Sequence, residues 1–336
     1  MKEFVPIILL ASERSGTNLL RALVSSHSAV ASPPPCSIVD VLANYQFQYF
    51  PPSQPPRIRE LVEDAITLTQ SHLNPWDMDL TPEMVMERMN QASFWDVFRV
   101  INELYSEKSG KSFWFTKEPA LLKHIFEIRA HMPSAKYIYL VRDGRDVASS
   151  ILKGGLQEFH VFDAANRWVH DQKICLCAIT DPLLKERIHM LKYEDLLEDP
   201  ESVMRRTMDF VGLEYETSQL EYYKRKNIID HSEKSRYWKN LSKPIDSSNK
   251  GRYRTNLNTR QIKIFESVAG KEMEYLGYSL DNEKRKRISA GDRAMFWIIA
   301  HIKMLLKRID RNQERARIRA RTKIFLNIQN RNYLRG

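Results

Sequence analysis

The chain has 336 residues, of which 43% are hydrophobic, and a net charge of +10, so it can bury one large core and carry an appended basic segment. Its three cysteines include no CxxC pair, which excludes a disulfide framework and a cysteine-rich zinc site and favours reduced thiols. No run of about 18 apolar residues occurs, which excludes a spanning helix, and the apolar run that starts at Phe4 leaves no room for a signal peptide, so we expect a cytoplasmic protein.

Apolar runs that fit buried strands alternate with stretches of helical periodicity over residues 4–280. The expected strands are 4–11, 112–117, 135–142 and 187–193. The expected helices begin near residue 19 and continue at 121–131, 143–153, 160–180, 199–212, 215–226 and 258–277. This alternation predicts an α/β fold with a parallel sheet and right-handed crossovers, which binds ligands at the carboxyl ends of its strands.

Three segments interrupt the alternation. Proline clusters at 33–35 and 51–56 predict loops, because proline neither donates to a strand ladder nor continues a helix. Residues 57–110 have helical periodicity with breaks at Pro75 and Pro82, which predicts a helical insertion into the core. Residues 227–254 are polar and show little periodicity, so we expect a long loop of the kind that is functional or disordered.

A polar turn, RSGTN, follows the first expected strand at residues 14–18. Strand, turn and helix in this order aim backbone N–H groups and the positive end of a helix dipole at an anion. Gly16 permits a close backbone approach, and Arg14 adds a fixed charge. Thr17 and Asn18 can cap the helix. The turn lacks the second glycine and the lysine of a GxxxxGK[ST] loop, and taken alone it is also compatible with an ordinary helix cap.

Two more basic clusters follow later in the chain. Arg142 leaves the end of the strand 135–142, and Ser150 follows two helical turns later, so the arginine fork and the serine hydroxyl can bind a phosphate. This cluster, VRDGRD, is also compatible with a solvated cap held by internal salt bridges. The sequence NKGRY at 249–253 is a basic turn within the expected long loop, and alone it is a weak signal.

Four blocks of the sequence, in order, resemble the sulfotransferases that use 3′-phosphoadenosine 5′-phosphosulfate (PAPS): RSGTNLL, AKYIYLVRDGRDVASSIL, MLKYEDLLEDPESVMRRTMDFVGL and KGRYRTNLN…AGKEMEYLGY. The resemblance spans about residues 4–280. It implies a nucleotide-kinase-like core with a P-loop-like turn, and in-line transfer of a sulfonyl group from PAPS to a hydroxyl or amine acceptor. It implies no metal.

The resemblance also implies which residues hold the donor. The matching positions are Arg14, Ser15, Gly16, Thr17 and Asn18 for the 5′-phosphosulfate; Arg142, Ser150, Lys250, Gly251 and Arg252 for the 3′-phosphate; and Tyr193 near the adenine. Two separated anionic groups need two cationic clusters, and the residues read without the resemblance supply them as well.

In-line transfer asks the protein mostly for positioning and for charge stabilisation on the leaving oxygen. Arg14 stands where many members carry lysine, and being permanently charged it can stabilise the leaving phosphate but cannot readily act as an acid.

The sequence departs from its relatives where they place the base. It reads SPPPCS where many have a carboxylate, and TKEP at 116–119 where cytosolic members place a histidine after the lysine. We expect Glu118 to be the base and Lys117 to stabilise the sulfonyl oxygens. Glu118 is also compatible with pairing to a binding arginine, and His124 and Asp40 are the alternative bases.

The positive charge is concentrated in residues 283–336, which hold 16 Lys and Arg against 4 Asp and Glu and sum to +12, so the first 282 residues sum to −2. One face of a predicted helix at 294–309 collects Met295, Ile298, Ile299, Ile302, Leu305, Leu306 and Ile309. The arginine-rich residues 311–323 follow. This segment is compatible with packing on the catalytic domain, with an anionic membrane surface, or with nucleic acid or another acidic polymer.

We therefore divide the chain into a sulfotransferase-like domain, 1–282, and a basic amphipathic helical tail, 283–336. The expected partners are PAPS and an acceptor, which can be a carbohydrate, a glycolipid or a peptide. We favour a carbohydrate or glycolipid and a location peripheral to the inner face of the membrane, because the tail points to a surface, and we do not favour nucleic acid. The alternatives are a P-loop phosphotransferase, which the missing Gly-Lys pair disfavours, and a non-catalytic polyanion-binding protein.

Overall fold

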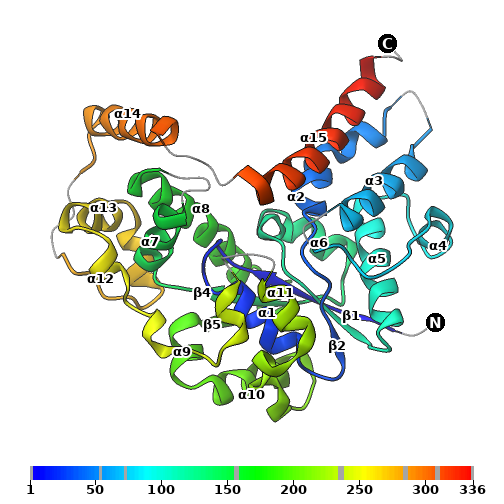
Figure 1. Ribbon diagram of the computed structural model, residues 1–336, viewed down its shortest axis with the longest axis horizontal. Helices are drawn as coiled ribbons and strands as arrows, with labels where there is room; N and C mark the ends of the chain where they lie inside the picture. The colour runs from blue at the N-terminus through cyan, green and yellow to red at the C-terminus, as the bar shows by residue number, and fades with distance from the viewer. Residues whose placement is uncertain are drawn as a thin grey trace.

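The computed structural model describes residues 3–52, 55–71, 74–154, 159–233, 238–282, 287–306 and 311–333. Its centre is a five-stranded sheet of order β2-β3-β1-β4-β5, in which every neighbouring pair is parallel (Figure 1). The strands are β1 (Val5–Leu10), β2 (Val30–Ala31), β3 (Phe113–Thr116), β4 (Lys136–Val141) and β5 (Ile188–Lys192). The predicted α/β fold with a parallel sheet is confirmed.

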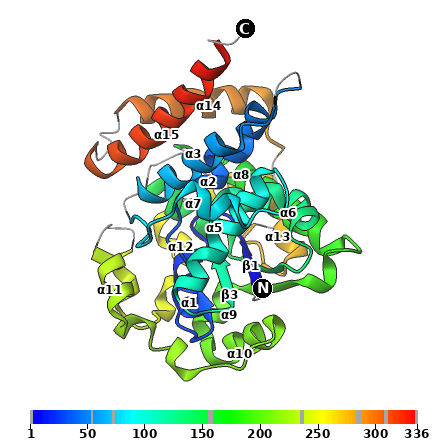
Figure 2. The same cartoon turned by 90° about the vertical axis from the view of Figure 1, so that its right-hand side faces the viewer.

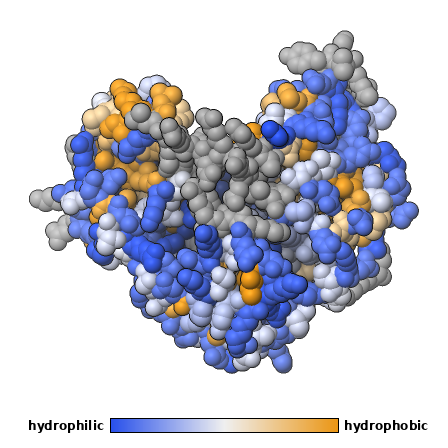
Figure 3. All heavy atoms as spheres, in the orientation of Figure 1, coloured by the Kyte–Doolittle hydropathy of each residue, from blue (hydrophilic) through white to orange (hydrophobic). Residues whose placement is uncertain are grey.

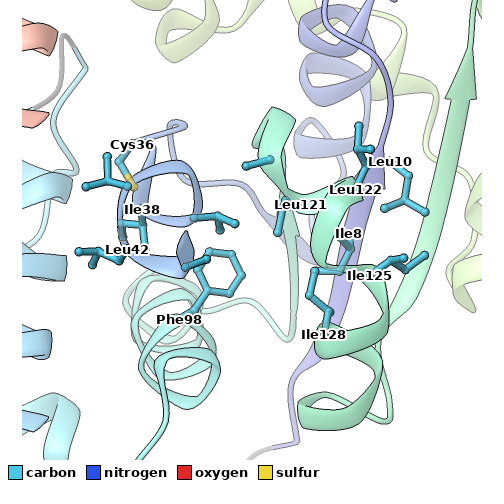
Figure 4. Close-up of a cluster of buried hydrophobic side chains, with 14 of the residues drawn as sticks. Ile8, Leu10, Cys36, Ile38, Leu42, Phe98, Leu121, Leu122, Ile125 and Ile128 are labelled. Carbon is cyan, nitrogen blue, oxygen red and sulfur yellow. The ribbon is translucent and has the colours of Figure 1, made fainter. Parts of the chain in front are cut away.

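Both faces of the sheet are covered, which explains why its strands read as continuous apolar runs. Ile8 and Leu10 point to one face, where they join a cluster that includes Phe98, Leu121 and Ile125 (Figure 4). Because successive side chains of a strand point to opposite faces, the residues between them face the other way. Ile7 and Leu9 accordingly belong to a second buried cluster, packed against α1 and α10.

Helices fill the connections between the strands (Figure 1). In chain order they are α1 (Thr17–Ser25), α2 (Ile38–Leu42), α3 (Ile58–Gln70), α4 (Pro82–Met86), α5 (Phe94–Lys108), α6 (Ile125–His131), α7 (Gly144–Gly154), α8 (Val161–Thr180), α9 (Tyr193–Glu198), α10 (Pro200–Val211), α11 (Lys226–Glu233), α12 (Tyr253–Asn256), α13 (Thr259–Tyr275), α14 (Ala290–Leu306) and α15 (Arg311–Tyr333). No helix within the described residues is both long and apolar enough to cross a bilayer.

The expected helical segment 57–110 contains α3, α4 and α5, inserted between β2 and β3. Two of its helices begin at residues that are typical of helix N-termini. Thr81 caps α4 through its side chain, with Pro82 in the first turn, and Ser93 caps α5 in the same way.

Two expectations about the second half of the chain are wrong. The expected helix 215–226 is two short 3₁₀ turns, η4 (Thr217–Gln219) and η5 (Tyr222–Lys224). Glu216 and Gln219 form a reciprocal capping box that closes the first turn at once. The expected long loop 227–254 is largely helical in its described part, with α11, two 3₁₀ turns (η6, Lys239–Ser242, and η7, Ser247–Asn249) and the start of α12.

The proline clusters at 33–35 and, in its described part, 51–56 lie outside helices and strands, as predicted. The elements beside them were not predicted: the short strand β2 precedes the first cluster, and the helix α2 and a 3₁₀ helix, η1 (Ala43–Tyr49), lie between the two. The first amides of α2 are held by Glu118, a residue 80 positions away in the sequence, so no local signal announces this helix.

The basic tail forms two helices that pack differently on the rest of the molecule. α15 packs on α3 and η1: Ile324 and Ile328 are buried, and Phe325 contacts Tyr45 at 5.3 Å between ring centroids. Arg331 pairs with the carboxylates of α3, at 3.0 Å from Asp64 and 3.1 Å from Glu60. α14 is attached mainly through one aromatic side chain and is described below. In both views the two helices lie along one side of the molecule (Figures 1 and 2).

Candidate donor and acceptor site

The turn between β1 and α1 has a backbone conformation that most residues avoid. Arg14 has φ of 69° and Gly16 has φ of 91°, so the chain passes twice through the left-handed region. A Cβ atom at Gly16 would lie 2.2 Å from Cε2 of Tyr193, because the tyrosine ring covers the turn. Glycine is thus required here both for conformation and for space.

Backbone N–H groups and a buried hydroxyl line this turn. Gly16 is the N-cap of α1, and no side chain caps the helix there, which differs from the predicted capping by Thr17 or Asn18. The hydroxyl of Ser15 is buried and has no hydrogen-bond partner among the described residues. Thr17 is buried as the first residue of α1 and lines the pocket described below. This turn has the donors and the helix end that an anionic group requires.

Arg142 leaves the end of β4 and reaches across to the β1 turn. Its Nη1 donates to the carbonyl of Arg14 at 3.0 Å, and its Nη2 donates to the carbonyl of Asn249 at 2.8 Å. Its guanidinium lies over the ring of Tyr193, 4.4 Å from the centroid. The Nε atom is buried and has no partner among the described residues, so the side chain is fixed while one donor is left to a ligand.

Ser150 joins the two predicted anion clusters. Its hydroxyl accepts a hydrogen bond from Nε of Arg14 at 3.1 Å. The structure therefore brings together the β1 turn, Arg142, Ser150 and Tyr193, which come from four segments of the chain. Their separate roles toward a nucleotide stay predictions.

The late basic turn is tied to this cluster through its backbone. Asp146 of α7 accepts from the amides of Gly251 at 2.8 Å and Tyr253 at 2.7 Å. Burial raises the pKa of the Asp146 carboxyl above its ordinary value. Sequence reasoning missed this residue, although it is the second aspartate of VRDGRD. Asp146 sets where the turn lies.

The two cations of the turn are exposed and contact nearby groups. Lys250 is paired with Glu198, and Arg252 donates through Nε to the carbonyl of Ser248 at 3.1 Å. Contact with a 3′-phosphate would require both side chains to leave these partners.

The rest of VRDGRD is structural. Arg145 is buried and pairs with Asp143 at 2.7 Å and with Glu266 at 2.7 Å. These carboxylates raise the pKa of the guanidinium against the opposing effect of burial. The alternative of a salt-bridged cap describes Arg145 and Asp143, except that the cluster is buried and not solvated.

A small pocket opens beside the β1 turn, where β3 ends next to β1. It is lined by Leu9, Ala11, Ser12, Glu13, Thr17, Lys117, Glu118 and Pro119. Lys117 and Glu118, the predicted catalytic residues that follow β3, are therefore at the wall of a pocket that also contains Thr17 of the turn. His124 and Asp40 are not among its lining residues: His124 lies 2.8 Å from Glu127, and Asp40 pairs with Arg321 of α15.

Glu118 is buried and holds the start of α2. One carboxylate oxygen accepts from the amides of Cys36 at 3.1 Å and Ile38 at 3.2 Å, and the other accepts from Val39 at 2.9 Å. Burial raises the pKa of this carboxyl, while the three amide bonds act in the opposite direction. Glu118 therefore has a structural role at the start of α2 that the sequence did not predict. Its role as the base stays a prediction.

The β1 turn is also supported from behind. Gln172 of α8 donates through Nε2 to the hydroxyl of Ser12 at 2.8 Å and accepts from the hydroxyl of Tyr139 of β4. All three side chains are buried. No sequence signal marks Gln172, because its partners are over 30 and 160 positions away.

A sequence model of the sulfotransferase family matches residues 6–217, a segment that contains the sheet except Val5 and most of the site. The chain belongs to the sulfotransferase family. The chain is 27% identical over 235 residues to an uncharacterised protein of Aquifex aeolicus, an alignment that covers 67% of this chain and 28% of the relative. It is 24% identical over 251 residues to a protein-tyrosine sulfotransferase of Drosophila melanogaster, covering 72% of this chain and 46% of the relative. The chain thus spans less than half the length of these two relatives.

Solved structures support the fold. The sulfotransferase domain of the Synechococcus PCC 7002 olefin synthase superposes with a TM-score of 0.54 at 22% identity, over 80% of this chain and 96% of the domain. The sulfotransferase domain of the curacin biosynthetic pathway gives a TM-score of 0.53 at 19% identity, over 83% and 99%.

Proposed function

We propose that this sulfotransferase moves a sulfonyl group from PAPS to a hydroxyl or amine acceptor. The observation that carries the proposal is the convergence of Arg142, Ser150 and Tyr193 on the β1 turn, with Arg142 bonded to the carbonyl of Arg14 and Arg14 bonded to Ser150. A donor with anionic groups at its 5′ and 3′ positions needs two cationic side chains, and these bonds fix Arg142 against the backbone of the turn and the Arg14 side chain against Ser150. The buried hydroxyl of Ser15 and the buried Nε of Arg142 have no hydrogen-bond partner within the described part of the chain, which supports the same fit.

The 5′-phosphosulfate would be held by the turn formed by Arg14, Ser15, Gly16, Thr17 and Asn18. The 3′-phosphate would be held by Arg142 and Ser150, with Lys250, Gly251 and Arg252 closing over it. Tyr193 would pack near the adenine. Among the described residues no group of three His, Cys, Asp or Glu side chains is arranged to hold a metal, and the proposal does not use one.

In the reaction, the acceptor oxygen or nitrogen bonds to sulfur while the bond from sulfur to the phosphate oxygen breaks. Arg14 would stabilise the negative charge that develops on the leaving phosphate, and Lys117 would stabilise the sulfonyl oxygens. Glu118 would take the acceptor proton, which its position on the pocket wall supports. The products are the sulfonated acceptor and adenosine 3′,5′-bisphosphate.

The acceptor class is the open part of the proposal. We favour a carbohydrate or a glycolipid, and the relative that sulfonates protein tyrosine makes a tyrosine peptide the main competing class. The test is transfer of labelled sulfonate from PAPS to a panel of sugars, glycolipids, tyrosine peptides and small alcohols. We expect transfer to at least one panel member by the wild type, and at least about 100-fold less by Arg14→Ala. No transfer by wild-type protein that binds adenosine 3′,5′-bisphosphate would contradict the proposed acceptor classes, and no binding would contradict the donor.

A further inference from the structure

Helix α14 presents a broad apolar face to the solvent. Its exposed large apolar side chains are Met295, Trp297, Ile298, Ile302, Met304 and Leu305. Trp297 is 61% exposed and Leu305 is 80% exposed, which is unusual for side chains of this size gathered on a single helix. Figure 3 shows apolar residues gathered where α14 lies in Figure 1.

The opposite side of α14 fixes this orientation. Phe296 is 3% exposed, stacks on His160 with ring centroids 4.5 Å apart, and contacts Phe162 at 5.4 Å. Burial, with Lys303 and Arg260 nearby, lowers the pKa of His160 to about 4, so its ring is neutral at pH 7 and packs as an aromatic group. The apolar face therefore points outward because the inner side is already occupied.

The positive charge of the tail indicates which partner can bind the apolar face of α14. Residues 283–336 carry +12, whereas the first 282 residues sum to −2. Arg293 and Lys303 are exposed on α14 itself, and Arg319 and Lys323 are exposed on α15. A second copy of the chain would bring two such segments together against their repulsion, and a nucleic acid would leave the apolar side chains in water. An anionic bilayer offers acyl chains and negative headgroups together.

We propose that α14 lies in the interface of an anionic lipid bilayer, with its apolar face among the acyl chains and its basic neighbours at the headgroups. A helix of 17 residues, about 25 Å long, is suited to lying in the plane and not to crossing the bilayer. α15, the other helix of the tail, reaches the start of α2: Arg321 donates to the hydroxyl of Ser37 at 2.9 Å, next to the amides that Glu118 binds. The inference that the acceptor is bound at a lipid surface rests on the proposed function. The binding of α14 to the bilayer does not.

The experiment measures sedimentation of the full-length chain with vesicles, in the absence of nucleotide. The vesicles are phosphatidylcholine alone or phosphatidylcholine mixed with phosphatidylglycerol. We expect binding to the anionic vesicles that weakens as salt is raised, and much weaker binding to the neutral ones. The double variant Ile298→Glu/Leu305→Glu should lower the partition coefficient roughly 10- to 100-fold, because two apolar side chains no longer enter the bilayer.

The control is Leu183→Glu, which adds one negative charge at a leucine outside the tail whose exposure, 66%, lies between those of Ile298 and Leu305. It should bind like the wild type, and equal thermal unfolding midpoints show that all variants are folded. Retained binding by the folded double variant, or no binding of wild type to anionic vesicles, overturns the proposal. Sedimentation velocity tests whether a second copy of the chain covers the apolar face instead. If the wild type is a dimer, the double variant is a monomer and neither binds vesicles, the face belongs to a second copy.

Discussion

The proposed donor side and the proposed acceptor side of the site are built in different ways. On the donor side, the β1 turn and Arg142 follow the ends of strands and Ser150 lies in α7; Arg142 donates to the carbonyl of Arg14, and Arg14 donates to the hydroxyl of Ser150. On the acceptor side, Glu118 binds amides of a helix that begins after a proline cluster, and α15 returns from the far end of the chain to hold Ser37.

This difference has a physical origin. The carboxyl ends of parallel strands meet at one edge of the sheet, so the fold alone brings the donor residues together once the strands are recognised. The proposed acceptor wall depends on hydrogen bonds between segments 80 and 284 positions apart. Substitutions on the donor side should therefore act on nucleotide binding, and those on the acceptor side should act on the acceptor.

The largest effect, a loss of nucleotide affinity, is expected for Gly16→Ala. The new Cβ would lie 2.2 Å from the ring of Tyr193, at a φ of 91° that alanine disfavours. Strain and displacement of the ring together should weaken binding of adenosine 3′,5′-bisphosphate at least about 100-fold in isothermal titration.

Gly110→Ala is the matched control, because Gly110 also has a positive φ, of 70°, but a Cβ there would meet no atom within 4 Å. It should lose only about 1 kcal/mol of stability and keep its nucleotide affinity. If the two variants bound nucleotide equally well, the close contact between the turn and Tyr193 would have no bearing on the donor.

The next largest effect, a loss of kcat, is expected for Glu118→Gln. As the base, Glu118 should account for about 10²- to 10⁴-fold in kcat, with nucleotide affinity nearly intact. Because burial raises its pKa, wild-type kcat should fall as the pH drops through that raised value, and the glutamine variant should lose this acidic limb.

The capping role predicts a different outcome for the same variant. Loss of charge at the three amides of Cys36, Ile38 and Val39 would lower the thermal unfolding midpoint and leave kcat per folded molecule, and its pH profile, unchanged. That result would remove Glu118 from the chemistry and leave it as the residue that positions α2.

The smallest effect is expected for Arg321→Ala. Its ion pair with Asp40 is largely exposed, so its loss should raise the KM for the acceptor only about two- to fivefold, with the KM for the donor unchanged. Arg319→Ala, an exposed arginine on the same helix, is the control and should leave both constants unchanged. A change in the donor KM with Arg321→Ala would break the proposed separation of the two sides.

The roles of the donor residues stay predictions. The sequence predicted four of the five strands, β1, β3, β4 and β5, and missed β2, because apolar runs that end in polar turns are local patterns. It did not predict α2, because the amides that begin this helix are held by Glu118 from another strand. It did not predict Asp146 or Gln172 either, since their partners become neighbours only after folding. The tail was predicted as one basic segment, but α15 packs through buried isoleucines and ion pairs while α14 exposes its apolar face.

The most direct test of the central claim is isothermal titration of adenosine 3′,5′-bisphosphate and of adenosine 5′-phosphate into the wild type and Arg142→Ala. We expect the wild type to bind the bisphosphate at least about 10-fold more tightly than the monophosphate. Arg142→Ala should weaken the bisphosphate roughly 10- to 100-fold, through loss of a charged hydrogen bond of about 1.5–3 kcal/mol, and affect the monophosphate much less. Equal wild-type affinity for the two nucleotides would contradict a site built around the 3′-phosphate.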